Sequence, residues 1–233
     1  SVFPFLMQSG YKGSSDLHAG LNVFGSLLGL IAGLALVAHY YSLGNALYFF
    51  LGLAFFISGA MDLLDGLLSF AASRGWGDLT EDAVDVYTVA AYLGGRLQMA
   101  LILILTPALM ERVDVPRGSK WRAFSFAAPV VLLGVLATVL LIQIASPRFV
   151  SPKELIARPG DFLVGILFAA AFVILLREYH SNRDMLTWWV LLSIGVSTVS
   201  QFMMAFSKEQ YDTQFNIAHA YKAIAYVVPI VGF

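Results

Sequence analysis

The chain has 233 residues, of which 59% are hydrophobic and only 12% are charged, and its formal net charge is −1. Soluble domains have about 25% charged residues, so this composition excludes an ordinary soluble domain, and the charge balance argues against a nucleic-acid partner. The lack of cysteine excludes disulfides and thiolate-bound metals. We therefore expect an all-α integral membrane protein that lies in the lipid bilayer.

Apolar stretches recur along the chain, each near the length of about 20 residues that a bilayer requires. They predict a single domain over residues 1–233, built as a bundle of seven transmembrane helices. The predicted helices cover residues 17–41, 45–71, 87–110, 121–145, 161–178, 185–207 and 215–233. Residues 73–85, which are rich in glycine and acidic side chains, form a predicted loop.

The orientation of the bundle is weakly encoded, because Lys and Arg are divided evenly between the loops on the two sides. The basic residues gathered in 112–122 favour a cytosolic position for that loop. This places the N-terminus outside and the C-terminus in the cytosol. The last predicted helix stops at Phe233 without polar flanking residues, and from this we expect a longer protein in which a cytoplasmic domain follows.

Asp62 and Asp65 lie within the predicted helix 45–71. Each carboxylate costs about 2.5–3.5 kcal/mol on membrane insertion, and such residues normally face the bundle interior and find partners there. Arg96, in the third predicted helix, is the natural partner, because arginine does not lose its proton. The alternative is that both aspartates reach the headgroup region.

Other polar residues recur at helical spacing on single faces. The second helix presents Ser58, Asp62, Asp65 and Ser69, and the seventh presents Asn216, His219, Lys222 and Tyr226. Because helix direction alternates, these faces share one half of the membrane with polar residues of four other helices. The candidate ligand-binding residues are Asp62, Asp65, Arg96, His18, Asn22, Gln201, His219, Lys222 and Asp161.

Three interpretations of these residues remain open. The opposite charges are compatible with a structural ion-pair network, and equally with a polar pocket for a ligand in the outer half of the membrane. A divalent metal ion is the third possibility, because imidazole and carboxylate suit zinc and similar ions. Its ligands would be His18, His219 and Asp65.

The sequence resembles the seven-helix membrane-associated sensor domains of bacterial signalling proteins (the MASE type), most closely the third class. In that family helix 1 opens with a His and then an acid, and here His18 is followed by Asn22. Helix 2 of the family has an acid, two apolar residues and a His, and here Asp62 is kept while Asp65 takes the position of the His.

The resemblance extends along nearly the whole chain. The remaining matches are Arg96 ahead of Thr106–Pro107, Asp161 opening helix 5, Ser200–Gln201 in place of Ser-Glu, and His219 with Lys222 in helix 7. The replaced residues mark a divergent member. Such domains precede a cytoplasmic output domain, such as a diguanylate cyclase or a histidine kinase, in homodimers of the bacterial cytoplasmic membrane.

The resemblance thus implies a sensory input domain, not itself an enzyme, that binds a small ligand or ion and signals through its seventh helix. Three rival functions each rest on a single feature. A small-solute or ion transporter fits a polar membrane interior, although repeats and broken helices are not evident. A metal-dependent phosphotransferase acting on CDP-linked lipids fits the run Asp62-Leu-Leu-Asp65-Gly66. A retinal protein would use Lys222, but its acids would be expected on the third helix.

Overall fold

The computed structural model describes residues 14–74, 81–112, 154–209 and 211–233, together with scattered positions between 125 and 140. These residues are helical or form turns, and no strand occurs among them. The helices are α2 (Ser15–Leu43), α3 (Ala46–Ser73), α4 (Glu81–Arg112), α6 (Pro159–Asn182), α7 (Met185–Ala205) and α8 (Thr213–Val231). Most of the predicted helix 121–145 lies outside the described residues, and the positions of it that are described are helical.

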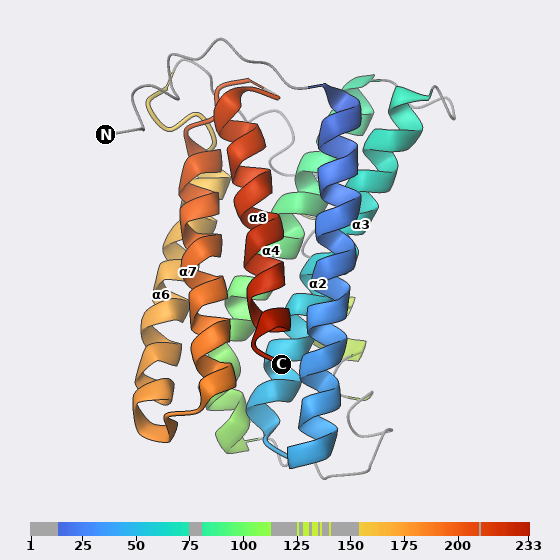
Figure 1. Ribbon diagram of the computed structural model, residues 1–233. Helices are drawn as coiled ribbons and strands as arrows, with labels where there is room; N and C mark the ends of the chain where they lie inside the picture. Colours follow the sequence, from blue (N-terminus) through green and yellow to red (C-terminus); the bar gives the residue numbers. More distant parts are fainter. Residues whose placement is uncertain are drawn as a thin grey trace.

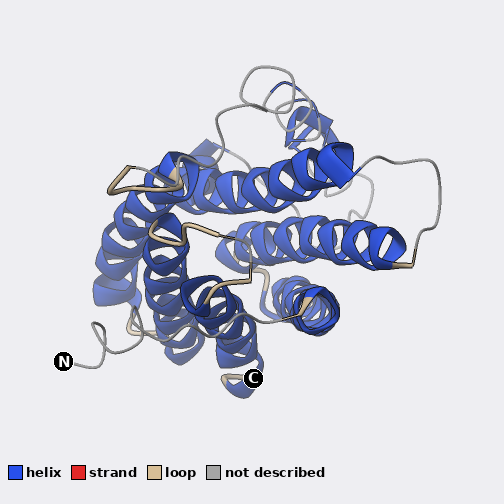
Figure 2. Cartoon of the chain, turned by 90° about the horizontal axis from the view of Figure 1, so that it is seen from above, coloured by secondary structure: helices blue, strands red, loops and turns tan. Residues whose placement is uncertain are grey.

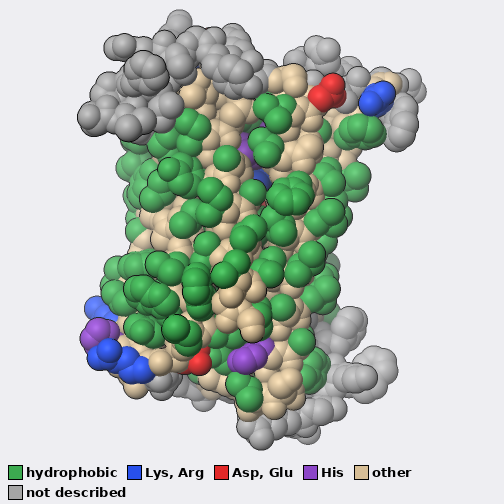
Figure 3. Space-filling model, viewed as in Figure 1, with side chains coloured by type: hydrophobic (Ala, Val, Ile, Leu, Met, Phe, Trp, Pro, Cys, Tyr) green, Lys and Arg blue, Asp and Glu red, His purple; other side chains and the backbone are tan. Residues whose placement is uncertain are grey.

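The outer surface of the molecule is apolar over most of its height. Five helices, α2, α3, α4, α6 and α7, are long and apolar enough to cross a membrane. In Figure 3 hydrophobic side chains cover the middle of the visible face, and charged side chains on that face lie mainly near the two ends. A soluble protein rarely exposes such a continuous apolar surface. The chain is therefore a multi-pass membrane protein, as its composition predicts.

The six described helices close into a ring. α2 packs against α3, α3 against α4, α4 against α6, α6 against α7, α7 against α8, and α8 returns to α2. Figures 1 and 2 show the bundle from the side and from one end, with neighbouring helices running along one another. Side chains that point inward from α2, α3, α4 and α8 consequently meet in the centre of the ring.

Glycines allow α2 and α3 to approach closely. A Cβ atom added to Gly33 would lie 2.6 Å from the backbone nitrogen of Phe56, and one added to Gly59 would lie 2.7 Å from that of Leu30. Real Cβ atoms essentially never come so near to backbone, so only glycine fits at these positions. The close contact lies near the middle of both helices and packs α2 directly against α3.

The helix boundaries differ most from expectation at α4. This helix begins at Glu81, whereas the sequence predicts a loop through residue 85 and a helix from residue 87. Acidic residues at the start of a segment do not exclude a helix, because negative charge is favourable near the positive end of the helix dipole. The helix therefore extends beyond its apolar stretch.

Candidate functional site

Buried polar side chains gather inside the ring, toward the end where α2 and α8 begin and α3 finishes. We call this group the polar cluster. Its members, all buried, are His18, Asn22, Ser58, Asp62, Asp65, Tyr92, Arg96, Asp161, Gln201, His219, Lys222 and Tyr226. They come from α2, α3, α4, α6, α7 and α8. The ring closure therefore brings together residues that lie as far apart in the sequence as Asn22 and Lys222.

Asp62, on α3, is the anionic centre of the cluster. Its Oδ1 accepts a hydrogen bond from Lys222 Nζ at 3.3 Å, and its Oδ2 accepts one from the hydroxyl of Tyr226 at 2.6 Å. Nη2 of Arg96 lies 3.5 Å from Oδ2. Since the single hydroxyl proton of Tyr226 goes to the carboxylate, Ser58 Oγ must donate the 2.8 Å bond that joins it to Tyr226. Asp62 is therefore linked to α4 through Arg96 and to α8 through two residues.

Asn22 bridges α2 to both α3 and α8. Its Oδ1 accepts a hydrogen bond of 2.5 Å from Lys222 Nζ, and its Nδ2 donates one of 2.7 Å to Asp65 Oδ2. These partners fix the orientation of the amide, because an ammonium group only donates and Lys222 must face the oxygen. The second Nδ2 hydrogen points to His18 Nε2 at 3.0 Å.

The two histidines of the cluster are in contact. The His18 and His219 rings lie 4.5 Å apart between centroids and meet edge to face. Nε2 of His18 accepts from Asn22, so its proton is on Nδ1, and this buried Nδ1 has no hydrogen-bond partner among the described residues. His219 Nδ1 donates to the carbonyl oxygen of Phe215 at 2.8 Å.

Arg96 lies at the centre of α4 and is completely buried. Its guanidinium carbon is 5.2 Å from the centroid of the Tyr226 ring and 5.9 Å from that of Tyr92, so aromatic faces lie on the cation. Nε, Nη1 and Nη2 all lack a hydrogen-bond partner within the part of the chain that the structure describes. An arginine normally uses its five N–H donors, whereas here the guanidinium has an ion pair with Asp62 but makes no hydrogen bond to another described residue.

Unpartnered acceptors lie on the helices opposite Arg96. Asp161, at the start of α6, has a buried Oδ1 without a described partner and is close enough to Arg96 to interact electrostatically. Gln201, on α7, donates from Nε2 to the hydroxyl of Tyr92 at 3.0 Å, but its Oε1 has no partner among the described residues. The region around Tyr92 therefore offers both unused donors and unused acceptors.

Each of the nine residues selected from the sequence lies in the polar cluster. The proposed metal set of His18, His219 and Asp65 is not assembled. Among the described residues no group of three or more histidine, aspartate or glutamate side chains is arranged to hold a metal ion. Asp65 is instead bonded to Asn22, which lies between it and His18.

Ser58 and Tyr226 were placed on polar helix faces but not among the nine candidates, and two further residues of this region, Tyr92 and Arg158, were not singled out from the sequence at all. Tyr92 precedes Arg96 by one helical turn, so its place on the same face of α4 could have been inferred from spacing alone. Arg158 lies between the predicted helices 121–145 and 161–178, yet it is buried, with its guanidinium 5.1 Å from the centroid of the Phe215 ring. Pro159 at the first position of α6 marks Arg158 as the N-cap residue and could have signalled this position.

A separate polar contact fixes the opposite end of the bundle. Asp184 caps α7, where its Oδ2 accepts a hydrogen bond of 2.7 Å from the backbone N–H of Thr187, and it also accepts one from the hydroxyl of Tyr48 on α3. Partial burial by itself would raise the pKa of Asp184, but these hydrogen bonds outweigh it and hold the pKa below its ordinary value. This end of α7 is thereby tied to α3.

The family of the protein follows from a comparison with known families. Residues 16–232 match the model of MASE3, a membrane-associated sensor domain. The chain belongs to the MASE3 family. This match extends from the first turn of α2 to the end of α8, so the whole polar cluster lies within the MASE3 domain, and the domain has a sensory input role at the membrane. The comparison with curated proteins gives no match.

Proposed function

We propose that the polar cluster is the sensory site of this MASE3 domain and that it binds a small polar molecule or ion. The observation that supports this most is Arg96, which is completely buried and has no hydrogen-bond partner for any of its nitrogens among the described residues. An unsatisfied buried donor costs about 1–3 kcal/mol, and more when it is charged. A ligand that accepts hydrogen bonds from Arg96 therefore gains much of this free energy on binding.

The ligand class follows from the unused groups. An oxygen acceptor, such as a carboxylate or a carbonyl, suits the donors of Arg96. An N–H or O–H group on the same molecule suits Oδ1 of Asp161 and Oε1 of Gln201, both of which lack described partners. A small molecule with both kinds of group, such as an amide or an amino acid, satisfies the site better than a simple anion, which would face Asp161 and Asp62.

The signal leaves the site through α8. A guest bound to Arg96 competes with Asp62 for the guanidinium, and Asp62 is the residue that holds Lys222 and Tyr226 of α8. Any change in these bonds alters how α8 packs against α2 and α3. The guest shifts the equilibrium between two packings only by the difference in its affinity for them.

The proposed signal acts on a second domain. We expect α8 to pass the change to a cytoplasmic signalling domain of the same protein, working as a homodimer in the bacterial cytoplasmic membrane with the N-terminus outside. The family description favours this function over transport and over phosphotransfer. In addition, Asp62 accepts a hydrogen bond from Tyr226 and Asp65 accepts one from Asn22, so both carboxylates are engaged by side chains of the bundle.

The test compares Arg96→Gln with wild type in the full-length protein. Thermal unfolding in detergent is followed with a panel of amino acids, small amides, carboxylates and inorganic anions. We expect at least one compound to raise the Tm of the wild type and to have no effect on Arg96→Gln. Arg177→Gln, at an exposed position of α6, is the matched control and should respond as the wild type does. Equal stabilisation of wild type and Arg96→Gln, or no stabilisation by any compound, would refute the proposal.

A further inference from the structure

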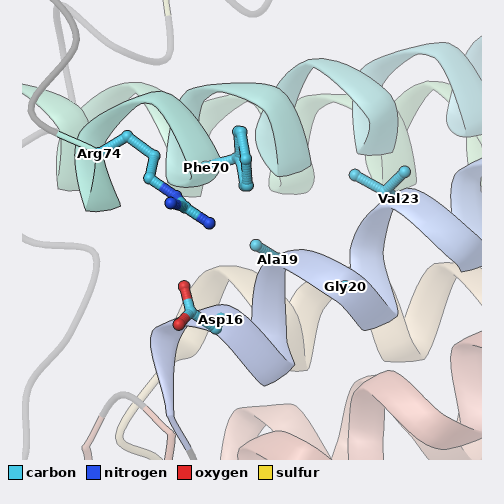
Figure 4. Close-up of a pocket in the computed structure, with 6 residues that line it drawn as sticks. All are labelled: Asp16, Ala19, Gly20, Val23, Phe70 and Arg74. Carbon is cyan, nitrogen blue, oxygen red and sulfur yellow. The ribbon is translucent and has the colours of Figure 1, made fainter.

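A cavity of about 400 Å³ opens on the outside of the ring, between the start of α2 and the end of α3. Its lining consists of Asp16, Ala19, Gly20, Val23, Phe70 and Arg74. Figure 4 shows Asp16 and Arg74 extending from the two helices toward the same opening, with Phe70 beside it. This cavity is distinct from the polar cluster, because none of its lining residues belongs to that group.

The polar end of the cavity presents one carboxylate and one guanidinium. Asp16 and Arg74 are both exposed, and no ion pair joins them in the part of the chain that the structure describes. The guanidinium carbon of Arg74 lies 5.3 Å from the centroid of the Phe70 ring, which leaves the N–H donors at the edge of the guanidinium directed away from the ring. The two charges therefore complement a ligand that has both a cation and an anion.

The other end of the cavity is apolar and continues into the membrane-facing surface. Beyond Val23, large exposed hydrophobic side chains follow along the same two helices, namely Phe24, Leu27 and Leu67. Asp16 and Arg74 lie at helix ends, where the apolar spans finish. This is the depth of the lipid headgroups, and an acyl chain attached to a headgroup there would lie along α2 and α3.

We propose that this cavity is a binding site for a zwitterionic phospholipid whose headgroup has a primary ammonium group. The phosphate contacts Arg74, the ammonium group contacts Asp16, and an acyl chain covers Phe70 and Val23. An anionic lipid without an amine leaves Asp16 without a partner. A quaternary ammonium headgroup cannot donate a hydrogen bond to Asp16, and a soluble zwitterion leaves the apolar lining uncovered.

Gly20 allows the cavity to be filled without disturbing the bundle. A Cβ atom added to Gly20 would meet no heavy atom within 4 Å. Gly20→Trp should therefore occupy the cavity, whereas Gly20→Ala removes the glycine and leaves the space open. Ala60→Trp adds the same side chain at an exposed position of α3 and serves as the matched control.

Native mass spectrometry of the full-length protein in detergent measures lipid retention after incubation with equal amounts of phosphatidylethanolamine, phosphatidylglycerol and phosphatidylcholine. We expect wild type, Gly20→Ala and Ala60→Trp to retain phosphatidylethanolamine preferentially, and Gly20→Trp to lose this preference. Equal retention of the three lipids by the wild type, or an unchanged preference in Gly20→Trp, would overturn the proposal and indicate ordinary boundary lipid.

Two further variants test the headgroup contacts. Asp16→Asn should reduce the preference for phosphatidylethanolamine over phosphatidylglycerol by about fivefold, the scale of one partly exposed ionic contact. Arg74→Gln should weaken the retention of both lipids, because both have a phosphate. A preference that survives Asp16→Asn, or retention that is unaffected by Arg74→Gln, would overturn the assigned headgroup contacts.

Discussion

Asp62 offers the sharpest test of the energetics of the polar cluster. Asp62→Asn keeps the shape of the side chain but removes its charge, and two buried cations then lose their nearest anion. These are Lys222 Nζ at 3.3 Å and Arg96 Nη2 at 3.5 Å. Removing one partner of a buried ion pair costs about 3–5 kcal/mol. We expect a loss of stability in this range and no larger, because Tyr226 can still donate to the side-chain oxygen of residue 62 and Ser58 can still donate to Tyr226.

Replacing one of the two cations that lose their anion should recover part of the stability lost in Asp62→Asn. Lys222→Met removes the ammonium group while keeping a long side chain, so the double variant Asp62→Asn/Lys222→Met no longer has an unpaired lysine. We expect the two substitutions to be non-additive by about 1–3 kcal/mol, with the double variant more stable than the sum predicts. Asp184→Asn, at the other end of the bundle, is the control and should combine additively with Lys222→Met.

Equilibrium unfolding by sodium dodecyl sulfate in mixed micelles, followed by circular dichroism and tryptophan fluorescence, gives the free energies for this cycle. Two results would refute the reasoning. One is a loss below about 1 kcal/mol for Asp62→Asn, which is less than a buried charge pair allows. The other is strict additivity with Lys222→Met, which would mean that the two groups do not interact in the folded protein.

Two further predictions concern packing and pH. Gly59→Ala should destabilise the bundle by about 1–3 kcal/mol, because its Cβ would lie 2.7 Å from the backbone nitrogen of Leu30. Gly20→Ala, where the added Cβ meets no heavy atom within 4 Å, should not be destabilising. Equal losses of stability for the two variants in the same detergent unfolding assay would contradict the α2–α3 packing. The folded protein holds the pKa of Asp184 below its ordinary value near 3.9, so the stabilisation from this residue is complete above that value and is lost as pH falls through the folded pKa. Asp184→Asn should therefore flatten the decline of Tm at acidic pH. An unchanged pH profile would argue against the bonds of Asp184 to Tyr48 and Thr187.

Helical periodicity predicts part of the polar cluster, namely which residues lie on the same face of one helix. Spacing alone places Asp62 and Asp65 on one face of α3, and it places His219 and Lys222 on one face of α8, because residues three or four apart are neighbours on a helix. Spacing does not show which face meets which. That Asn22 joins Asp65 to Lys222 depends on the contact of α8 with α2, which closes the ring.

The amino-acid sequence by itself indicated that this protein is an all-α membrane protein, where its six described helices lie, and which polar residues share a face of one helix. These properties depend on composition and on contacts within single helices. The tertiary structure alone decided that Arg96 has no hydrogen-bond partner among the described residues, that the His18 and His219 rings touch, and that a cavity opens beside Gly20. Such features depend on how closely separate helices approach, and that distance is set by side chains from several helices at once.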